Sequence, residues 1–230
     1  MGRLLSAFFL LLAVLTPAAP AGAPPARVNL ISILVEKKAG DTVQAVDPAH
    51  VFASGDTVRF RLRPGVDGYL YVMDLNTSGK YQVLFPLPQT GNDNRILHGH
   101  DYLVPATENG WFSITGPSGR ERLYFVLSPI ALTIGQTQQR TENMPPQGIA
   151  PSTMQPRCDD AIFKARGDCV DSGAGPQAVP PGEPLPRGLA PLTHGASRDL
   201  TFTQSSTAST VSSAAPLTGP VVYEFLLAHR

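Results

Sequence analysis

Alternation of apolar and polar residues marks residues 28–128 and predicts strands along most of that region. The clearest case is residues 57–63, TVRFRLR, in which every second residue is an arginine or a threonine. The residues between them are apolar: Val58, Phe60 and Leu62. Successive side chains of an extended chain point to opposite faces, so this pattern predicts a strand with one buried and one solvated face.

Residues 68–75, GYLYVMDL, are apolar on both faces, which is typical of a central strand. A turn cluster, NTSG, separates them from residues 80–85, and the two runs are predicted to form an antiparallel hairpin. Further strands are expected at residues 28–36, 95–104, 111–115 and 121–127. Short strands with regular turn punctuation predict an all-β fold, an antiparallel β-sandwich of about 7–9 strands.

The pattern changes after this region. Residues 131–220 are rich in Pro, Gly, Ser and Thr, a composition that buries too little apolar surface to offset chain entropy. Strand character then returns in residues 221–230, which begin VVYEFLLAH. We therefore expect a sandwich domain at residues 27–130, a long flexible insertion, and a terminal strand that returns to the sandwich.

The first residues resemble a secretory signal peptide. Arg3 precedes an apolar run of about a dozen residues, which is shorter than the roughly 20 that a membrane span needs. Small residues follow, and cleavage after Ala21 would remove residues 1–21. The alternative is an uncleaved anchor. We expect an exported protein, periplasmic or associated with the cell envelope, with no transmembrane segment in the mature chain.

The chain has two cysteines, Cys158 and Cys169. In an oxidising compartment two thiols usually pair, so a disulfide is expected to pin the loop at residues 158–169 inside the insertion. Acidic residues followed by basic ones and then Gly167 predict a short helical turn within this loop. The spacing does not match a redox CxxC pair, and two cysteines do not complete a zinc site.

The composition argues against a nucleic-acid partner and against a helical fold. Eighteen Lys and Arg balance eighteen Asp and Glu, so no basic excess favours nucleic acid. Only 16% of the residues are charged, whereas 23 are Pro and 21 are Gly, which agrees with a turn-rich β protein rather than a helical bundle.

Two features could bind a partner. Arg59, Arg61 and Arg63 form a basic stripe on one strand face, which is either a solvated face or a surface for an anionic group. Trp111, the one tryptophan, is either part of the core or exposed and able to stack on a sugar.

No catalytic constellation stands out, and neither a GxSxG nucleophile motif nor a phosphate-binding glycine loop is present. His98, His100 and Asp101 are the residue types that ligate metals, but two histidines on one face do not make a site. The sequence therefore predicts a protein that is not an enzyme, with no cofactor and no metal site.

The segment from Ala39 to Ser128 resembles the bacterial family called domain of unknown function 4384. The resemblance is carried by Phe52, Ser54-Gly55-Asp56, residues 68–72 (GYLYV), Gly79, residues 84–86 (LFP), residues 94–96 (NRI), Gly99, Tyr102, Pro105 and residues 116–121 (GPSGRE). It implies an all-β module, to which the terminal strand would also belong, of a kind found in exported or envelope-associated bacterial proteins and also fused to peptidase-like or kinase domains. It carries over no catalytic residue.

These observations favour an exported, non-catalytic β-sandwich that mediates protein–protein interaction in the bacterial periplasm or cell envelope. The alternative is a carbohydrate- or peptidoglycan-binding module that uses exposed aromatic side chains. The partner is expected to be an envelope or periplasmic protein, or else a cell-wall glycan.

Overall fold

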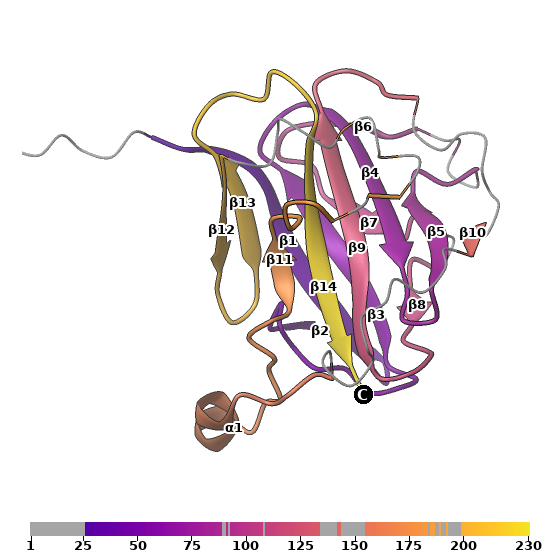
Figure 1. The fold of residues 1–230 in the computed structure, drawn as a ribbon, viewed down its shortest axis with the longest axis vertical. Coiled ribbons are helices and arrows are strands. Elements are labelled where there is room, and N and C mark those ends of the chain that lie inside the picture. The colour runs from indigo at the N-terminus through magenta and orange to yellow at the C-terminus, as the bar shows by residue number, and fades with distance from the viewer. Residues whose placement is uncertain are drawn as a thin grey trace, which may run out of the picture.

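Two antiparallel β-sheets pack face to face in the computed structural model (Figure 1). The structure describes residues 26–88, 91, 93–107, 109–133, 142–143, 155–183, 185–186, 189, 192 and 199–230. The all-β sandwich predicted from the alternating pattern is confirmed. The predicted signal peptide, residues 1–21, lies outside the described residues.

The first sheet has the order β12-β13-β1-β3-β7, with β2 added to β1 and β8 added to β3. Its strands are β1 (Val28–Ala39), β2 (Thr42–Val46), β3 (Thr57–Pro64), β7 (Tyr102–Val104), β8 (Phe112–Ser113), β12 (Leu200–Gln204) and β13 (Ser209–Ser213). The long β1 lies between β3 and β13, which are far apart in the sequence.

The second sheet has the order β10-β5-β4-β9-β14-β11, with β6 added to β4. Its strands are β4 (Gly68–Leu75), β5 (Lys80–Phe85), β6 (Arg95–Ile96), β9 (Gly119–Ser128), β10 (Glu142–Asn143), β11 (Gly175–Gln177) and β14 (Val221–His229). The terminal strand β14 pairs with β9 along its whole length, from Val221 opposite Leu127 to His229 opposite Gly119.

Inward-facing aromatic rings fill the space between the two sheets. Phe60 of the first sheet meets Phe125 and Phe225 of the second edge to face, at ring-centroid distances of 5.8 and 5.2 Å. Phe125 also stacks on Tyr223 at 5.3 Å. Edge-to-face and offset-stacked pairs are the favoured aromatic geometries, and they join the two layers into one core.

The structure differs from the expectation for part of the insertion. Within residues 131–220, the described residues 175–177, 200–204 and 209–213 form strands instead of irregular chain. The segment STVSS of β13 alternates, and its inward residues, with Val211 at the centre, are buried. Composition averaged over ninety residues hid this period of two, because Ser and Thr occupy both the strands and the turns. As a result, the strands of the described residues outnumber the expected 7–9.

The outer face of the second sheet is covered by the chain that follows β11. We call residues 178–192 the strap, of which residues 178–183, 185–186, 189 and 192 are described. Leu185 and Leu189 of the strap pack against a cluster from β4, β9 and β14 that contains Tyr71 and Tyr124. In Figure 1 this segment crosses in front of β14 and β9. The second sheet is therefore covered on both faces.

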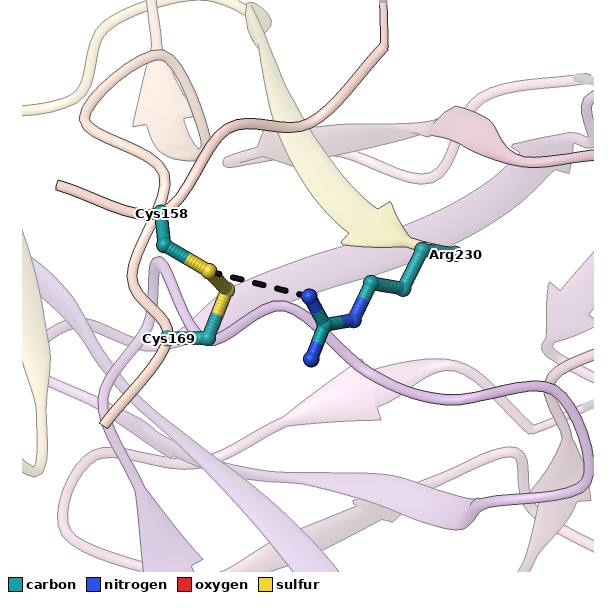
Figure 2. Close-up of a disulfide and its surroundings, with 3 residues drawn as sticks. All are labelled: Cys158, Cys169 and Arg230. Carbon is teal, nitrogen blue, oxygen red and sulfur yellow. Dashed lines mark hydrogen bonds between the residues drawn. A yellow bond between two sulfur atoms is a disulfide. The ribbon is translucent and has the colours of Figure 1, made fainter. Parts of the chain in front are cut away.

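Cys158 and Cys169 form a disulfide, with their Cα atoms 4.6 Å apart (Figure 2). The loop that they close docks against residues 49–51: the Val51 amide donates to the Cys169 carbonyl and the Asp171 amide donates to the Ala49 carbonyl, each at 2.9 Å. The Arg230 guanidinium lies over the bridge, with Nη1 3.8 Å from Cys158 Sγ (Figure 2). The disulfide loop and the C-terminal residue thus meet at one end of the sandwich.

Helix α1 (Asp160–Arg166) occupies the loop, as the charge pattern predicted. The Asp159 side chain accepts a hydrogen bond from the Ile162 amide at 3.0 Å, and Gly167 ends the helix with a φ of 76°. A left-handed residue at this position favours glycine. None of the helix residues is buried, and α1 projects from the sandwich (Figure 1). Among the described residues, no helix has the length and apolar character needed to cross a bilayer.

We expect the double variant Cys158→Ser/Cys169→Ser to be less stable by about 3 kcal/mol, the loop-closure entropy of a cross-link over this span. The midpoint of denaturant unfolding, compared with the oxidised protein, measures the difference. Thiol titration of unreduced, denatured wild-type protein is the control and should find no free thiol. An unchanged midpoint would show that the loop unfolds independently of the sandwich.

Candidate functional site

The outward face of β3 carries the arginines singled out by the sequence. Because β3 alternates, Val58, Phe60 and Leu62 are fully buried between the sheets, and the arginines project from the opposite face. The register places Glu36 of β1 directly opposite Arg59. On the other side, β7 and β8 pair with β3 and bring Asp101 and Trp111 to the same face.

These residues form one continuous row, which we call the arginine face: Trp111, Arg59, Glu36, Arg61, Asp101 and Arg63. Glu36 accepts hydrogen bonds from Arg59 Nε at 2.5 Å and from Arg61 Nε at 2.6 Å. Asp101 accepts from Arg63 Nε at 2.7 Å. Each carboxylate lies between two arginines, since Arg61 Nη1 is also 3.5 Å from Asp101. Three guanidinium groups and two carboxylates leave the row with one excess positive charge.

Hydrogen bonds from the arginines lower the pKa of both carboxylates. Burial opposes ionisation of Glu36, but hydrogen bonds from Arg61 and Arg59 outweigh it, and the pKa of Glu36 lies below its ordinary value. The more exposed Asp101 has its pKa lowered mainly by the hydrogen bond from Arg63. Both therefore stay charged at neutral pH, and the row presents fixed charges on a rigid sheet.

Exposure grows along the row. The side chain of Arg59 is 15% exposed, that of Arg61 32% and that of Arg63 61%. Trp111 is half-buried, and the Arg59 guanidinium lies 4.2 Å from its ring centroid, within cation–π range. Trp111 is thus neither a core residue nor a fully exposed platform. The structure brings all four predicted binding residues together, with Arg63 as the most accessible cation.

The histidines of residues 98–100 do not gather ligands. Both are exposed, and the His98 amide donates to Asp67 Oδ1 at 2.7 Å, which is a turn contact. Within the described residues, no group of three or more His, Cys, Asp or Glu side chains is arranged to hold a metal ion.

The sandwich also encloses an acidic cluster that the sequence pattern did not predict. Asp74 of β4, Glu121 of β9 and His229 of β14 all point inward, on neighbouring strands at the same end of the second sheet. Asp74 is 3% exposed, Glu121 4% and His229 0%. His229 Nε2 is 3.8 Å from Glu121 Oε1, and Gln82 donates to Asp74 Oδ2 at 3.0 Å. Each of these residues falls at an inward position of its strand, between or beyond apolar inward residues, and a charged residue at such a position was the available signal.

Burial favours the uncharged form of each group in this cluster. It raises the pKa of Asp74 to about 7, against the weaker opposing effect of the hydrogen bond from Gln82. Burial, together with the nearby Asp74 charge, raises the pKa of Glu121 to about 8. Burial also lowers the pKa of His229, so its neutral form is favoured. All three side chains are enclosed and away from solvent, so we expect their shifted pKa values to make the stability of the fold depend on pH.

Comparison with known proteins identifies the segment that contains β3 to β9. Residues 51–130 match the model of the domain of unknown function family DUF4384, which confirms the resemblance seen in the sequence. The match covers about a third of the chain and includes all three arginines, Asp101 and Trp111. Glu36, the disulfide loop and β11 to β14 lie outside it. No curated protein and no solved structure was found to match the chain.

We expect the stability of the wild type, relative to Asp74→Asn, to fall as the pH rises from about 4 to about 7. The folded-state pKa of Asp74 is raised to about 7 from 3.8, so the fold binds this proton more tightly than the unfolded chain does. Asn preserves the acceptor for Gln82 but cannot ionise. At neutral pH the free energy of unfolding of Asp74→Asn should therefore exceed that of the wild type by more than about 1 kcal/mol. Denaturant unfolding across this range measures the difference.

Asp101→Asn is the matched control with the opposite sign. The pKa of Asp101 is lowered, so the stability that it contributes is present at neutral pH and is lost as the pH falls. A pH-independent difference between the wild type and Asp74→Asn would contradict a raised pKa for Asp74.

Proposed function

We propose that this protein is an exported, non-catalytic β-sandwich module that binds a partner protein in the bacterial periplasm or cell envelope through the arginine face. The observation that carries the proposal is the row of three arginines with only two carboxylates, ending in the 61% exposed Arg63. A partner surface with a carboxylate patch complements this face, because carboxylates accept paired hydrogen bonds from guanidinium groups.

The rigidity of the row supports binding. Arg59 and Arg61 are held by Glu36, and Arg59 is also held against Trp111, so their side chains are ordered before a partner arrives. Preorganised side chains lose less conformational entropy on association. Arginine and tryptophan are also the residue types that most often dominate protein–protein interfaces.

Export is supported by three features. These are the predicted signal peptide, the disulfide between Cys158 and Cys169, and the match to a family that the resemblance places in exported and envelope-associated proteins. A disulfide of this kind persists in an oxidising compartment. Cell fractionation tests this part: we expect a chain shortened by about 21 residues outside the cytoplasm, and full-length protein in the cytosol would contradict it.

We expect Arg63→Glu to reduce cross-linking of the tagged protein to its partner in its own cells by at least about fivefold, because the change turns the accessible cation into an anion. Arg95→Glu is the matched control: it makes the same reversal on the exposed start of β6, in the other sheet. Mass spectrometry of the cross-linked products gives the yield. Equal loss in both variants, or no loss in either, would show that the arginine face is not the contact surface.

A carbohydrate- or peptidoglycan-binding module is the second candidate, favoured by the position of Trp111 beside Arg59, Glu36 and Asp101. Aromatic rings flanked by hydrogen-bonding groups suit sugar rings and their hydroxyls. Because the chain has one tryptophan, its fluorescence reports directly on this face. If envelope glycans bind here, soluble peptidoglycan fragments should change the Trp111 emission saturably, and Trp111→Ala protein should no longer be retained on insoluble peptidoglycan.

The variants Arg63→Glu and Trp111→Ala distinguish protein binding from glycan binding. Protein binding predicts that Arg63→Glu loses its partner while glycan retention is absent from the start. Glycan binding predicts that Trp111→Ala loses retention and remains folded, as judged by its β-sheet circular dichroism.

A further inference from the structure

The outer face of the second sheet is unusually apolar for a face on the outside of a sandwich. We call Tyr71, Met73, Tyr124, Val126 and Val222 the tyrosine face; none of them is more than 4% exposed. The outer face of an antiparallel sheet is commonly solvated and polar. This one needs a cover, and the cover is the strap together with Leu132, whose backbone amide and carbonyl both hydrogen-bond to the Tyr71 hydroxyl at 2.7 Å.

The strap is held on this face by side chains. Leu185 and Leu189 are buried against the tyrosines. The backbone hydrogen bonds that its described residues make are internal turns: Glu183 to Pro180, Leu189 to Pro186 and Leu192 to Leu189. Prolines have no amide hydrogen with which to extend a ladder. The described residues of the strap therefore lie on the sheet without joining its hydrogen-bond ladder.

Among the described residues of the strap, one ion pair links it to the sheet, and the arrangement of this pair permits release. Glu183 of the strap pairs with Arg122 of β9. Arg122 has a second partner, since its Nε is 3.1 Å from Glu224 Oε2 on β14. Glu224 in turn accepts a hydrogen bond from Gln177 at 2.6 Å. When the strap leaves, Arg122 keeps a carboxylate and Glu183 enters water, so no buried charge loses its only partner.

Both ends of the strap are anchored in the fold. Before it, β11 pairs with β14 over Gly175–Gln177; after it, β12 pairs with β13 over Leu200–Gln204. Lifting the strap therefore breaks none of these strand pairs, and the tethered segment can return to the same place.

We propose that the strap is a releasable cover, and that the tyrosine face beneath it binds an extended, proline-rich segment of a partner protein in the strap's place. The seated strap defines the chemistry of this partner segment: leucines spaced by prolines, with one carboxylate for Arg122. Extended proline-rich chains bind aromatic surfaces with a small loss of entropy, and the thioether of Met73 adapts to different side chains. This surface lies on the opposite sheet from the arginine face, so its test is independent of the proposed function.

The test asks whether the strap sequence binds when it is supplied as a separate molecule. The probe is a fluorescently labelled peptide with the sequence of residues 178–192, AVPPGEPLPRGLAPL. The receiving protein is the full chain with Leu185→Ser and Leu189→Ser, which weakens the tethered strap and leaves the tyrosine face intact. We expect saturable binding, measured by fluorescence anisotropy, that is at least about tenfold tighter than to the wild type, whose face is mostly occupied.

Three controls match these changes, one in the protein and two in the peptide. Leu97→Ser makes the same substitution at an exposed leucine away from the tyrosine face and should bind like the wild type. A peptide carrying Leu185→Ser and Leu189→Ser should not bind, and a peptide carrying Glu183→Lys should bind more weakly because it repels Arg122.

Several results would overturn the proposal. One is a folded, disulfide-bonded double variant that does not bind the peptide, which would make the strap a permanent part of the fold. A second is equal binding to the wild type and the variant. A third is concentration-dependent dimerisation of the variant without peptide binding, which would make a second copy the occupant. If the double variant does not fold, the full chain with Glu183→Lys replaces it, because this change disturbs only the ion pair. We again expect the peptide to bind at least about tenfold more tightly than to the wild type. Absence of binding would again overturn the proposal.

Discussion

Burial of both faces of β14 is the constraint on which the rest of the structure depends. All nine residues of this strand are buried. Its inward side meets the aromatic residues of the first sheet, and its outward side needs a second cover, which the strap and the disulfide loop provide. The segment that matches the DUF4384 family contains neither β14 nor β1, so the strands that complete both sheets come from the flanking sequence.

Glu36 and Asp74 both lose contact with water in the fold, but their charge states differ. Glu36 is nearly buried and stays charged, because two guanidinium groups are within hydrogen-bond distance of its oxygens. Asp74 lies deeper, on the inward face of its strand, and has only an amide partner, so burial raises its pKa to about 7. Depth and neighbours together decide the charge of each carboxyl. This difference separates a surface able to attract an anion from an interior cluster that changes stability with pH.

Most of the sandwich could be predicted from the sequence, because its strands have a strong period of two or an apolar run with clear turns. The arginine row on β3 and the terminal strand followed directly from this pattern. The partners of the arginines did not follow from it, because Glu36 lies in β1 and Asp101 directly precedes β7, and only the register of three strands places them together. The strands β11 to β13 were missed because they are short or lie in a segment dominated by Ser, Thr and Pro, where the helical and strand periods are weak. The strap was missed for a related reason, since proline-rich composition indicates extended chain but not what it rests on.

The order in which the strands occur along the chain has a consequence for how the protein reaches this fold. Strand β1 pairs with β13, near the other end of the chain, and β9 pairs with β14 across the whole intervening segment. Contacts between residues so distant in sequence form late, because a long loop must close before they repay the lost entropy. Until β13 is in place β1 exposes an unpaired edge, and until β14 is in place β9 does the same, and unpaired edges are prone to intermolecular strand pairing. The chain is therefore most prone to aggregation before β13 and β14 have paired with β1 and β9.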